Sequence, residues 1–281
     1  MTHNEYQNSP AINWSRLKLV GESPAHYRLG AVSASQDTLD FGTGFHCLVF
    51  EPMEFPTRFA VWPESAGQRR GKAWEAFMEE AGERTILREQ DIVKIRAMAA
   101  AVRDSDAYAD LMALTGGATP AVEAPMMWSE EVAGRRWDFK ARPDFVAGPV
   151  LADLKSTMTT HAPRFGSQAA RLGWHGQLAH YAAGCRAVYG TDPTTVAFVA
   201  VEKAAPHDVA VFQLLPEDLA LGLALREEYL TRLAECLDRG RWPSRYEGIQ
   251  FVRLPAWASS SEAVTSEDFD DEAGDVLAGL T

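Results

Sequence analysis

The sequence contains few cysteines and no long apolar run. Its three cysteines, Cys47, Cys185 and Cys236, are far apart and form neither a CxxC pair nor the spacing of metal ligands. We therefore expect buried thiols in a reducing cytoplasm. No apolar stretch approaches the roughly 20 residues of a membrane helix. The start, MTHNEYQNSP, lacks the basic region and apolar stretch of a secretory signal. These absences favour a soluble, cytoplasmic protein without membrane attachment.

Basic residues are also scarce, because 27 Lys and Arg stand against 39 Asp and Glu, for a net charge of −12. This balance argues against a nucleic-acid partner. Seven acidic residues and no basic residue, however, follow Arg253, and we expect an acidic, flexible tail over residues 259–281. The stretch from Arg135 to Arg171 is instead rich in basic residues. It could bind a phosphate backbone, whereas the plain alternative is an ordinary solvated surface.

The order of predicted elements indicates an α/β protein. Hydrophobic spacing predicts helices in the first third and near the end, and apolar or alternating runs predict strands between them. The expected helices cover 12–20, 38–52 (ended by Pro52), 72–82 (ended by Gly82), 91–105, 162–189 and 216–239 (ended by Gly240), and the expected strands cover 122–128, 135–146, 149–157, 195–203 and 207–215. We expect one domain over 1–258, with a helical part over 1–115 and a catalytic core over 120–246.

Two aspartates and a lysine form the most informative pattern, in RPDFVAGPVLADLKST. Asp144 lies on the first of two strands joined by the turn AGP, and Asp153 lies on the second. Because side chains alternate along a strand, Asp153 and Lys155 share one face while Leu154 points into the core. A hairpin can bring Asp144 beside that face. Clustered oxygen ligands of this kind suit Mg²⁺ or Mn²⁺.

A metal at this position could activate a water for phosphodiester hydrolysis, while Lys155 orients or deprotonates that water. The plain alternative is a solvent-facing ion pair between Asp153 and Lys155. The apolar run PVLADL places Asp153 at the end of a mostly buried strand. A charged pair there needs a compensating partner, and a metal ion would supply one.

The same residues carry a resemblance to a known family. Pro143-Asp144 followed by Asp153-x-Lys155 resembles the PD-(D/E)XK nuclease motif. Downstream, Gln177 and Tyr181 match the Gln-x-x-x-Tyr signature of the subgroup that includes the RecB-type nucleases. On a helix, this spacing places both side chains on one face.

The wider match runs from about Ile12 to Tyr246 and resembles the RecE-type, exonuclease-VIII-like branch. It rests on the ordered segments NWSRLKLVGESPAHYR, GTGFHCLVFEP, RPDF, DLKST, GWHGQLAHY and FVAVEKAAPHDVAVF. The resemblance implies a restriction-endonuclease-like α/β core, in which helices flank a central mixed β-sheet, with an added helical N-terminal region.

Further site residues follow from the resemblance. His46 occupies the position of a helix histidine that approaches the metal in related nucleases, and Glu123 lies where relatives carry an acidic residue. The expected metal ligands are therefore Asp144, Asp153, the carbonyl of Leu154, His46 and Glu123, and the expected catalytic residues are Lys155, Asp153, Asp144, Gln177 and Tyr181. Arg16 could bind a terminal phosphate, whereas Arg69, Arg70 and Lys72 are as well explained as a solvated loop.

The function that the resemblance implies is Mg²⁺-dependent exonucleolytic hydrolysis of double-stranded DNA from the 5′ end, in recombination or repair. A duplex DNA end, a single-strand annealing protein and further copies in a homo-oligomeric ring are the implied partners. One alternative is a RecB-like nuclease of single strands or flaps. Its iron–sulfur version needs four cysteines, so an iron–sulfur cluster is excluded. The other alternative is a DNA-binding or assembly module without catalysis.

Overall fold

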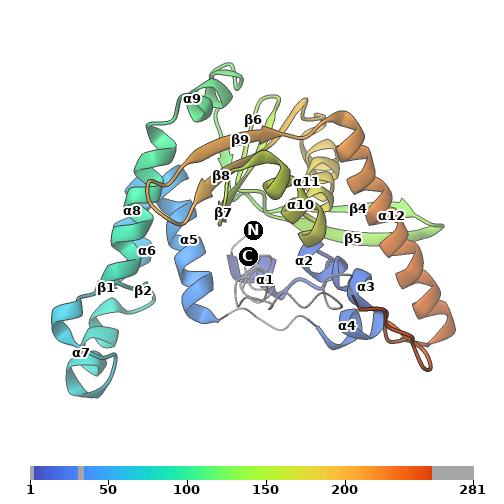
Figure 1. The fold of residues 1–281 in the computed structure, drawn as a ribbon, viewed down its shortest axis with the longest axis horizontal. Coiled ribbons are helices and arrows are strands. Elements are labelled where there is room, and N and C mark those ends of the chain that lie inside the picture. The colour runs from blue at the N-terminus through green and yellow to red at the C-terminus, as the bar shows by residue number, and fades with distance from the viewer. Residues whose placement is uncertain (1–2, 31–34, 255–281) are drawn as a thin grey trace.

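A five-stranded mixed sheet forms the centre of the computed structural model, which describes residues 3–30 and 35–254 (Figure 1). Its strands are ordered β3-β6-β7-β8-β9, with β7 and β8 parallel and the other neighbours antiparallel. Their bounds are Ala121–Val122 (β3), Phe145–Ala147 (β6), Val150–Thr157 (β7), Thr195–Glu202 (β8) and Val209–Gln213 (β9). The expected mixed α/β architecture is therefore confirmed.

The two faces of this sheet belong to two hydrophobic clusters. Along β7, Leu151 packs in one cluster, whereas Val150, Ala152 and Leu154 pack in the other. Nearly every residue of β7 is buried, as expected for a strand that is covered on both faces. Asp153 lies in the middle of β7 rather than at the end of the strand, so burial of its charge is more complete than the sequence suggested.

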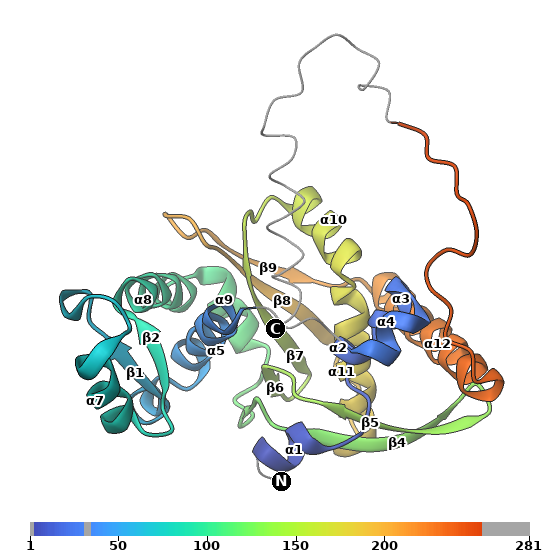
Figure 2. The ribbon, with the colours of Figure 1, turned by 90° about the horizontal axis from the view of Figure 1, so that it is seen from below.

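The first cluster is covered by helices from both ends of the chain, together with a long hairpin (Figures 1 and 2). Trp14 and Leu17 from the N-terminal segment pack there with Leu178 and Leu230. The elements on or near this side are α1 (His3–Asn8), α2 (Trp14–Leu17), α3 (Leu19–Glu22), α4 (Pro24–Leu29), α10 (Ala162–Leu172), α11 (Trp174–Tyr189), α12 (Pro216–Arg239), β4 (Met126–Val132) and β5 (Arg135–Ala141).

The second cluster is covered by helices from the first half of the chain, among them the helix of His46. The elements of this side are α5 (Gln36–Phe50), α6 (Phe55–Arg58), α7 (Gly71–Ala81), α8 (Glu89–Arg103), α9 (Asp106–Ala113), the 3₁₀ turns Pro52–Glu54 and Glu64–Ala66, and the parallel pair β1 (Phe59–Trp62) and β2 (Thr85–Arg88). The α7 end of this region projects furthest from the central sheet (Figure 2). The helices predicted over 1–115 thus divide between both faces of the sheet.

Helix ends agree with the sequence signals. The helix α5 ends two residues before Pro52, and α7 and α12 end at Gly82 and Gly240, both with positive φ. The predicted helix over 162–189 is wrong in one respect, because a left-handed residue at Gly173 divides it into α10 and α11.

Two strand predictions are also wrong in part. The run 135–146 is not one strand, because it leaves the β4–β5 hairpin after Ala141 and joins the central sheet only at Phe145. Pro143 in this break has no N–H for a sheet ladder. The run 122–128 is broken after Val122, where Glu123 has a φ of 43°. The strands β1 and β2 were not predicted, because four residues carry too little alternation to be detected.

All three cysteines are free and buried. Among the described residues, none of the helices combines the length and apolar character needed to cross a lipid bilayer. The acidic tail predicted over 259–281 lies outside the described residues.

Candidate active site

The β6–β7 hairpin brings the two predicted aspartates together. Asp144 directly precedes β6, and its Oδ2 accepts a hydrogen bond from the backbone N–H of Leu154 at 2.7 Å. The side chain of Leu154 packs in the core on the opposite face, as alternation along β7 requires. Asp144 and Asp153 are 8% and 2% exposed, so both carboxyl groups are held in a largely dry environment.

Lys155 connects the hairpin to helix α11. Its Nζ lies 2.7 Å from Asp153 Oδ2 and donates a hydrogen bond to Gln177 Oε1 at 2.9 Å. Gln177 Nε2 in turn donates to the Tyr181 hydroxyl at 2.9 Å, one helical turn further along α11. Trp174 places its ring 5.1 Å from the same ammonium. The predicted helix face carrying Gln177 and Tyr181 is therefore turned toward the Asp-x-Lys strand.

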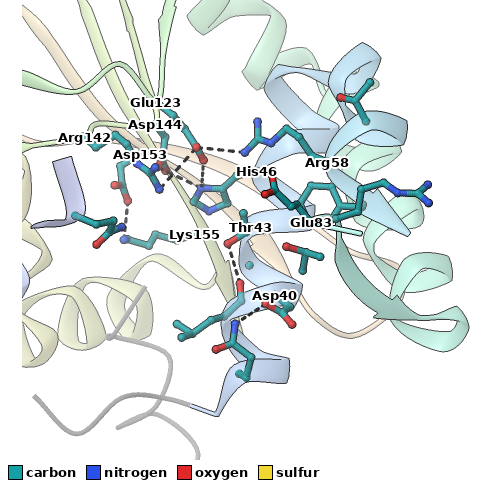
Figure 3. Close-up of a pocket in the computed structure, with 18 of the residues that line it drawn as sticks. Asp40, Thr43, His46, Arg58, Glu83, Glu123, Arg142, Asp144, Asp153 and Lys155 are labelled. Atoms are coloured by element: carbon teal, nitrogen blue, oxygen red, sulfur yellow. Dashed lines mark hydrogen bonds and ion pairs between the residues drawn. The ribbon is translucent and has the colours of Figure 1, made fainter. Parts of the chain in front are cut away.

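His46 and Glu123 approach the aspartates from another direction (Figure 3). His46 Nδ1, on α5, lies 3.2 Å from Asp144 Oδ1 and 4.0 Å from Glu123 Oε1. The other carboxylate oxygen of Glu123 lies 3.6 Å from Arg58 and 3.8 Å from Arg142. The left-handed backbone at Glu123 is costly for a residue with a side chain, and such strain is concentrated at functional sites.

Burial and charge act differently on the two aspartates. Burial alone would raise the pKa of Asp144, but the adjacent His46 and the hydrogen bonds that Asp144 accepts hold that pKa below its ordinary value. For Asp153, burial dominates and raises the pKa to about 6, although Lys155 opposes the shift. The carboxylates likewise raise the pKa of His46 against the effect of its burial. Burial raises the pKa of Tyr181 well above its ordinary value, so this phenol stays neutral.

A cavity of about 880 Å³ collects these side chains. The seven predicted residues that line it are His46, Glu123, Asp144, Asp153, Lys155, Gln177 and Tyr181. Leu154 reaches the site only through its backbone. Arg16 lines a different cavity beside Tyr27, and Arg69 lies against Asp37 and is not among the residues that line the large cavity.

Sequence reasoning missed several lining residues. Asp40 and Thr43 precede His46 on α5 at spacings of three, so a search for polar residues on the histidine face would have found them. Arg142 adjoins the Pro-Asp motif, and the sequence marks it only as one of the basic residues between Arg135 and Arg171. Arg58 and Gln7 come from remote segments, and no local pattern distinguishes them.

The donor set fits a hard divalent cation in its chemistry. Asp144, Asp153 and Glu123 supply oxygens around one cavity, and His46 supplies an imidazole. Asp153 Oδ2 is buried beside Lys155, yet within the described residues no donor meets it with hydrogen-bond geometry. No three His, Cys, Asp or Glu side chains of the described chain are already grouped closely enough to hold an ion. His46 and Lys155 instead stand next to the two aspartates, where they offset the carboxylate charge.

Comparisons with known proteins identify the family of the chain. Residues 14–255 match the family model described as a PDDEXK-like domain of unknown function (DUF3799). A search of curated protein sequences finds no significant match.

Two solved structures are similar to the chain in different degrees. The crystal structure described as a "putative exonuclease" from Eubacterium rectale superposes with a TM-score of 0.57 at 12% identity, covering 94% of this chain and 99% of that one. At this identity the likeness concerns the fold alone. The crystal structure of SSO0001 has a TM-score of only 0.29 at 14% identity, over 74% of this chain and 87% of that one, which is too low to indicate a shared fold. With its nuclease-like fold and a family match over most of its length, the chain belongs to the PDDEXK-like family and, through it, to the PD-(D/E)XK nuclease superfamily.

Proposed function

We propose that this protein is a Mg²⁺-dependent DNA exonuclease that degrades double-stranded DNA, with Mn²⁺ as an alternative metal. One observation carries the proposal. Asp153, Lys155 and Gln177 are linked by contacts between their side chains, and Asp144 is bound to the backbone of Leu154 between them. All four line one large cavity. Buried ionisable groups with opposing pKa shifts are typical of catalytic sites. The likeness in fold to a protein described as an exonuclease supports the same reaction class.

The metal would be held by Asp144, Asp153, the carbonyl of Leu154, His46 and Glu123. When bound, it supplies a Lewis acid that polarises the scissile phosphate and lowers the pKa of a water. The chain's own residues then have separate tasks. The Leu154 N–H fixes the rotamer of Asp144 by binding one carboxylate oxygen and leaving the other toward His46. Glu123 is fixed by Arg58 and Arg142 in the same way.

We assign two tasks to Lys155. It orients or deprotonates the attacking water, and it offsets the negative charge that develops around phosphorus. Its ammonium is held from two sides, by Asp153 and by Gln177, and is only 6% exposed. A fixed cation in a water-poor site stabilises developing negative charge more strongly than one in solvent. Gln177 orients the ammonium, and Tyr181 orients Gln177 because its hydroxyl accepts a hydrogen bond from the Gln177 side-chain amide.

The finer parts of the proposal rest on the sequence resemblance. They are digestion from the 5′ end, a role in recombination or repair in the cytoplasm, a homo-oligomeric ring, a single-strand annealing partner, and residues 1–258 acting as one domain. The chain as a whole is acidic, but three arginines line the cavity and supply local positive charge for a phosphate backbone: Arg58, Arg84 and Arg142.

The test is digestion of matched DNA substrates. A linear duplex labelled at its 5′ ends, a single strand and a covalently closed circle are each incubated with Mg²⁺ and, separately, with EDTA. We expect Mg²⁺-dependent release of labelled nucleotides from the linear duplex and an intact circle. Lys155→Ala should abolish release, whereas Lys94→Met, which alters an exposed lysine of α8, should not. Rapid cutting of the circle, preference for the single strand, or full activity of Lys155→Ala would contradict the proposal.

A further inference from the structure

Lys140 is a buried lysine that holds the N-terminal helix through backbone oxygens. It lies on β5 and is 7% exposed. Its ammonium donates to the carbonyl oxygens of Tyr6 at 2.8 Å, Gln7 at 3.2 Å and Ser9 at 2.9 Å. Burying an ammonium is costly unless its donors are satisfied, and here three donors meet three acceptors. The carbonyl end of a helix is also the negative end of its dipole. The contact therefore fixes α1 against β5.

The backbone of Lys140 ties two further segments to the same point. Its N–H donates to the carbonyl oxygen of Ile12 at 3.0 Å. Its carbonyl oxygen lies 3.1 Å from Nε2 of His180, on α11. Arg226 donates to the other ring nitrogen of His180, so Nε2 carries the proton and donates to Lys140. One residue thereby sets the position of α1 relative to the helix that carries Gln177 and Tyr181.

The helix held in this way forms part of the wall of the large cavity. At six residues, α1 is too short to be stable alone. Its exposed Gln7 lines the 880 Å³ cavity. Gln7 also lines a neighbouring cavity of about 180 Å³, together with Tyr6, Arg142 and Tyr181. The helix α1 thus stands where the two cavities adjoin.

We propose that Lys140 is a positioning residue, which fixes α1 so that the Gln7 side chain contacts the DNA strand entering the site. This inference rests on the proposed function. A side-chain amide can donate to phosphate or sugar oxygens and also accept from a base edge, as Gln side chains do in DNA complexes. Arg142 adds a guanidinium to the same wall. Because such a contact forms before the chemical step, it should affect substrate binding rather than turnover.

The kinetic test is a double-mutant cycle on the linear duplex. Lys140→Met and Gln7→Ala should each raise KM by about 10-fold and change kcat by less than about 2-fold. The double variant should be no worse than Lys140→Met, because both changes remove one contact. Gln7→Glu should raise KM further through repulsion of phosphate, and its matched control, Asn8→Glu, should not, since exposed Asn8 lies outside the cavity lining. Additive single effects, or a fall in kcat at unchanged KM, would overturn the assignment.

A second readout is independent of activity and of the fate of the proposed function. Hydrogen exchange of the amides over residues 5–9 should be slow in wild type and fast in Lys140→Met, with α11 unchanged. Unchanged exchange would overturn the tether itself. If wild type neither binds nor cuts DNA, the proposed function fails and the DNA contact of Gln7 fails with it, whatever exchange shows. If Lys140→Met does not fold, the two substitutions at exposed Gln7 still decide the contact.

Discussion

Helix α11 contributes to two polar clusters, each built around buried groups, that differ in how completely those groups are paired. The Arg226 cluster consists of Arg226, Glu130 and His180. Arg226 binds Glu130 with two nitrogens, at 2.6 and 3.2 Å, and donates to His180 at 3.3 Å. Burial and the nearby guanidinium lower the pKa of His180 to about 3, so the ring is neutral and satisfied at both nitrogens.

The site cluster consists of His46, Asp144, Asp153 and Lys155, and its polar groups are less completely hydrogen-bonded. Its carboxylates are balanced by neighbouring cations, and Asp153 Oδ2 meets no described donor with hydrogen-bond geometry. Its groups also line a cavity, whereas His180 and Arg226 pack against the rings of Trp128 and Phe139. The Arg226 cluster therefore has its polar partners complete within the protein, whereas the site cluster presents carboxylates to a cavity in which a ligand can meet them.

The largest expected effect is the loss of nuclease activity when a residue of the site cluster is substituted. Asp153→Asn removes a buried charge at almost constant volume, so Mg²⁺-dependent nucleolysis should fall by about 10³-fold or more. The free energy of unfolding in EDTA should change by less than about 1 kcal/mol, because the raised pKa of Asp153 means that its charge is disfavoured at this position, and Lys155 keeps Gln177 as a partner. Initial rates and urea unfolding measure the two quantities. Near-normal activity would remove Asp153 from the site.

The reverse pattern is expected for Arg226→Met. Losing the guanidinium leaves Glu130 and His180 without their partner, and breaking a buried pair costs about 3–5 kcal/mol. The low end applies, because the Glu130 side chain is 37% exposed. At a temperature where the variant is folded, the nuclease rate should stay within a few-fold of wild type. A variant that is fully stable but inactive would reverse the roles of the two clusters.

His180 and Asp153, one from each cluster, contribute opposite pH dependences to stability in EDTA. The folded pKa of His180, about 3, lies below its ordinary 6.5, so the unfolded chain binds the proton first and stability is lost as pH falls through 6.5. The folded pKa of Asp153, about 6, lies above its ordinary 3.8, so this group instead adds stability as pH falls from about 6 toward 3.8.

Denaturant unfolding at pH 7.5 and 5.5 checks the histidine contribution. The difference in unfolding free energy between wild type and His180→Gln should narrow by about 1.4 kcal/mol at the lower pH. This is because pH 5.5 lies one pH unit below the ordinary histidine pKa of 6.5, at which the unfolded chain takes up its proton. A difference that does not change with pH would mean that His180 is not held neutral in the folded protein.

The smallest effect is expected at an ordinary surface pair. Arg135 and Asp238 form an ion pair in which the side chains are 40% and 65% exposed. Arg135→Ala should cost less than about 1 kcal/mol and leave cleavage unchanged. A larger loss of stability would show that exposed charges matter more here than the contrast between the clusters implies.

The parts that the sequence predicted are those set by short-range spacing. Alternation along β7 predicted that Asp153 and Lys155 share one face, and the spacing of Gln177 and Tyr181 predicted that both share one helix face. That this helix face meets the aspartates followed only from the family resemblance. Helix ends at Gly82 and Gly240 followed from local backbone preference. In each case the determining interaction lies within a few residues.

The parts that were missed depend on tertiary structure. The chain leaves one sheet after Ala141 and enters another at Phe145, and Glu123 adopts a left-handed backbone, because sheet pairing outweighs local propensity. The contacts of Arg58 with Glu123 and of Lys140 with α1 join segments separated by more than 60 residues. Spacing within a segment has no information about such pairs.

Calorimetric titration of Mn²⁺ into the metal-free protein tests the central claim most directly, because it requires no turnover. We predict one saturable binding event in wild type, accompanied by proton release as the cation displaces His46 and Asp153 protons. Binding should be lost in Asp153→Asn and retained in Arg226→Met. Equal binding by wild type and Asp153→Asn, or no binding by wild type, would contradict the assignment of this cluster to the metal.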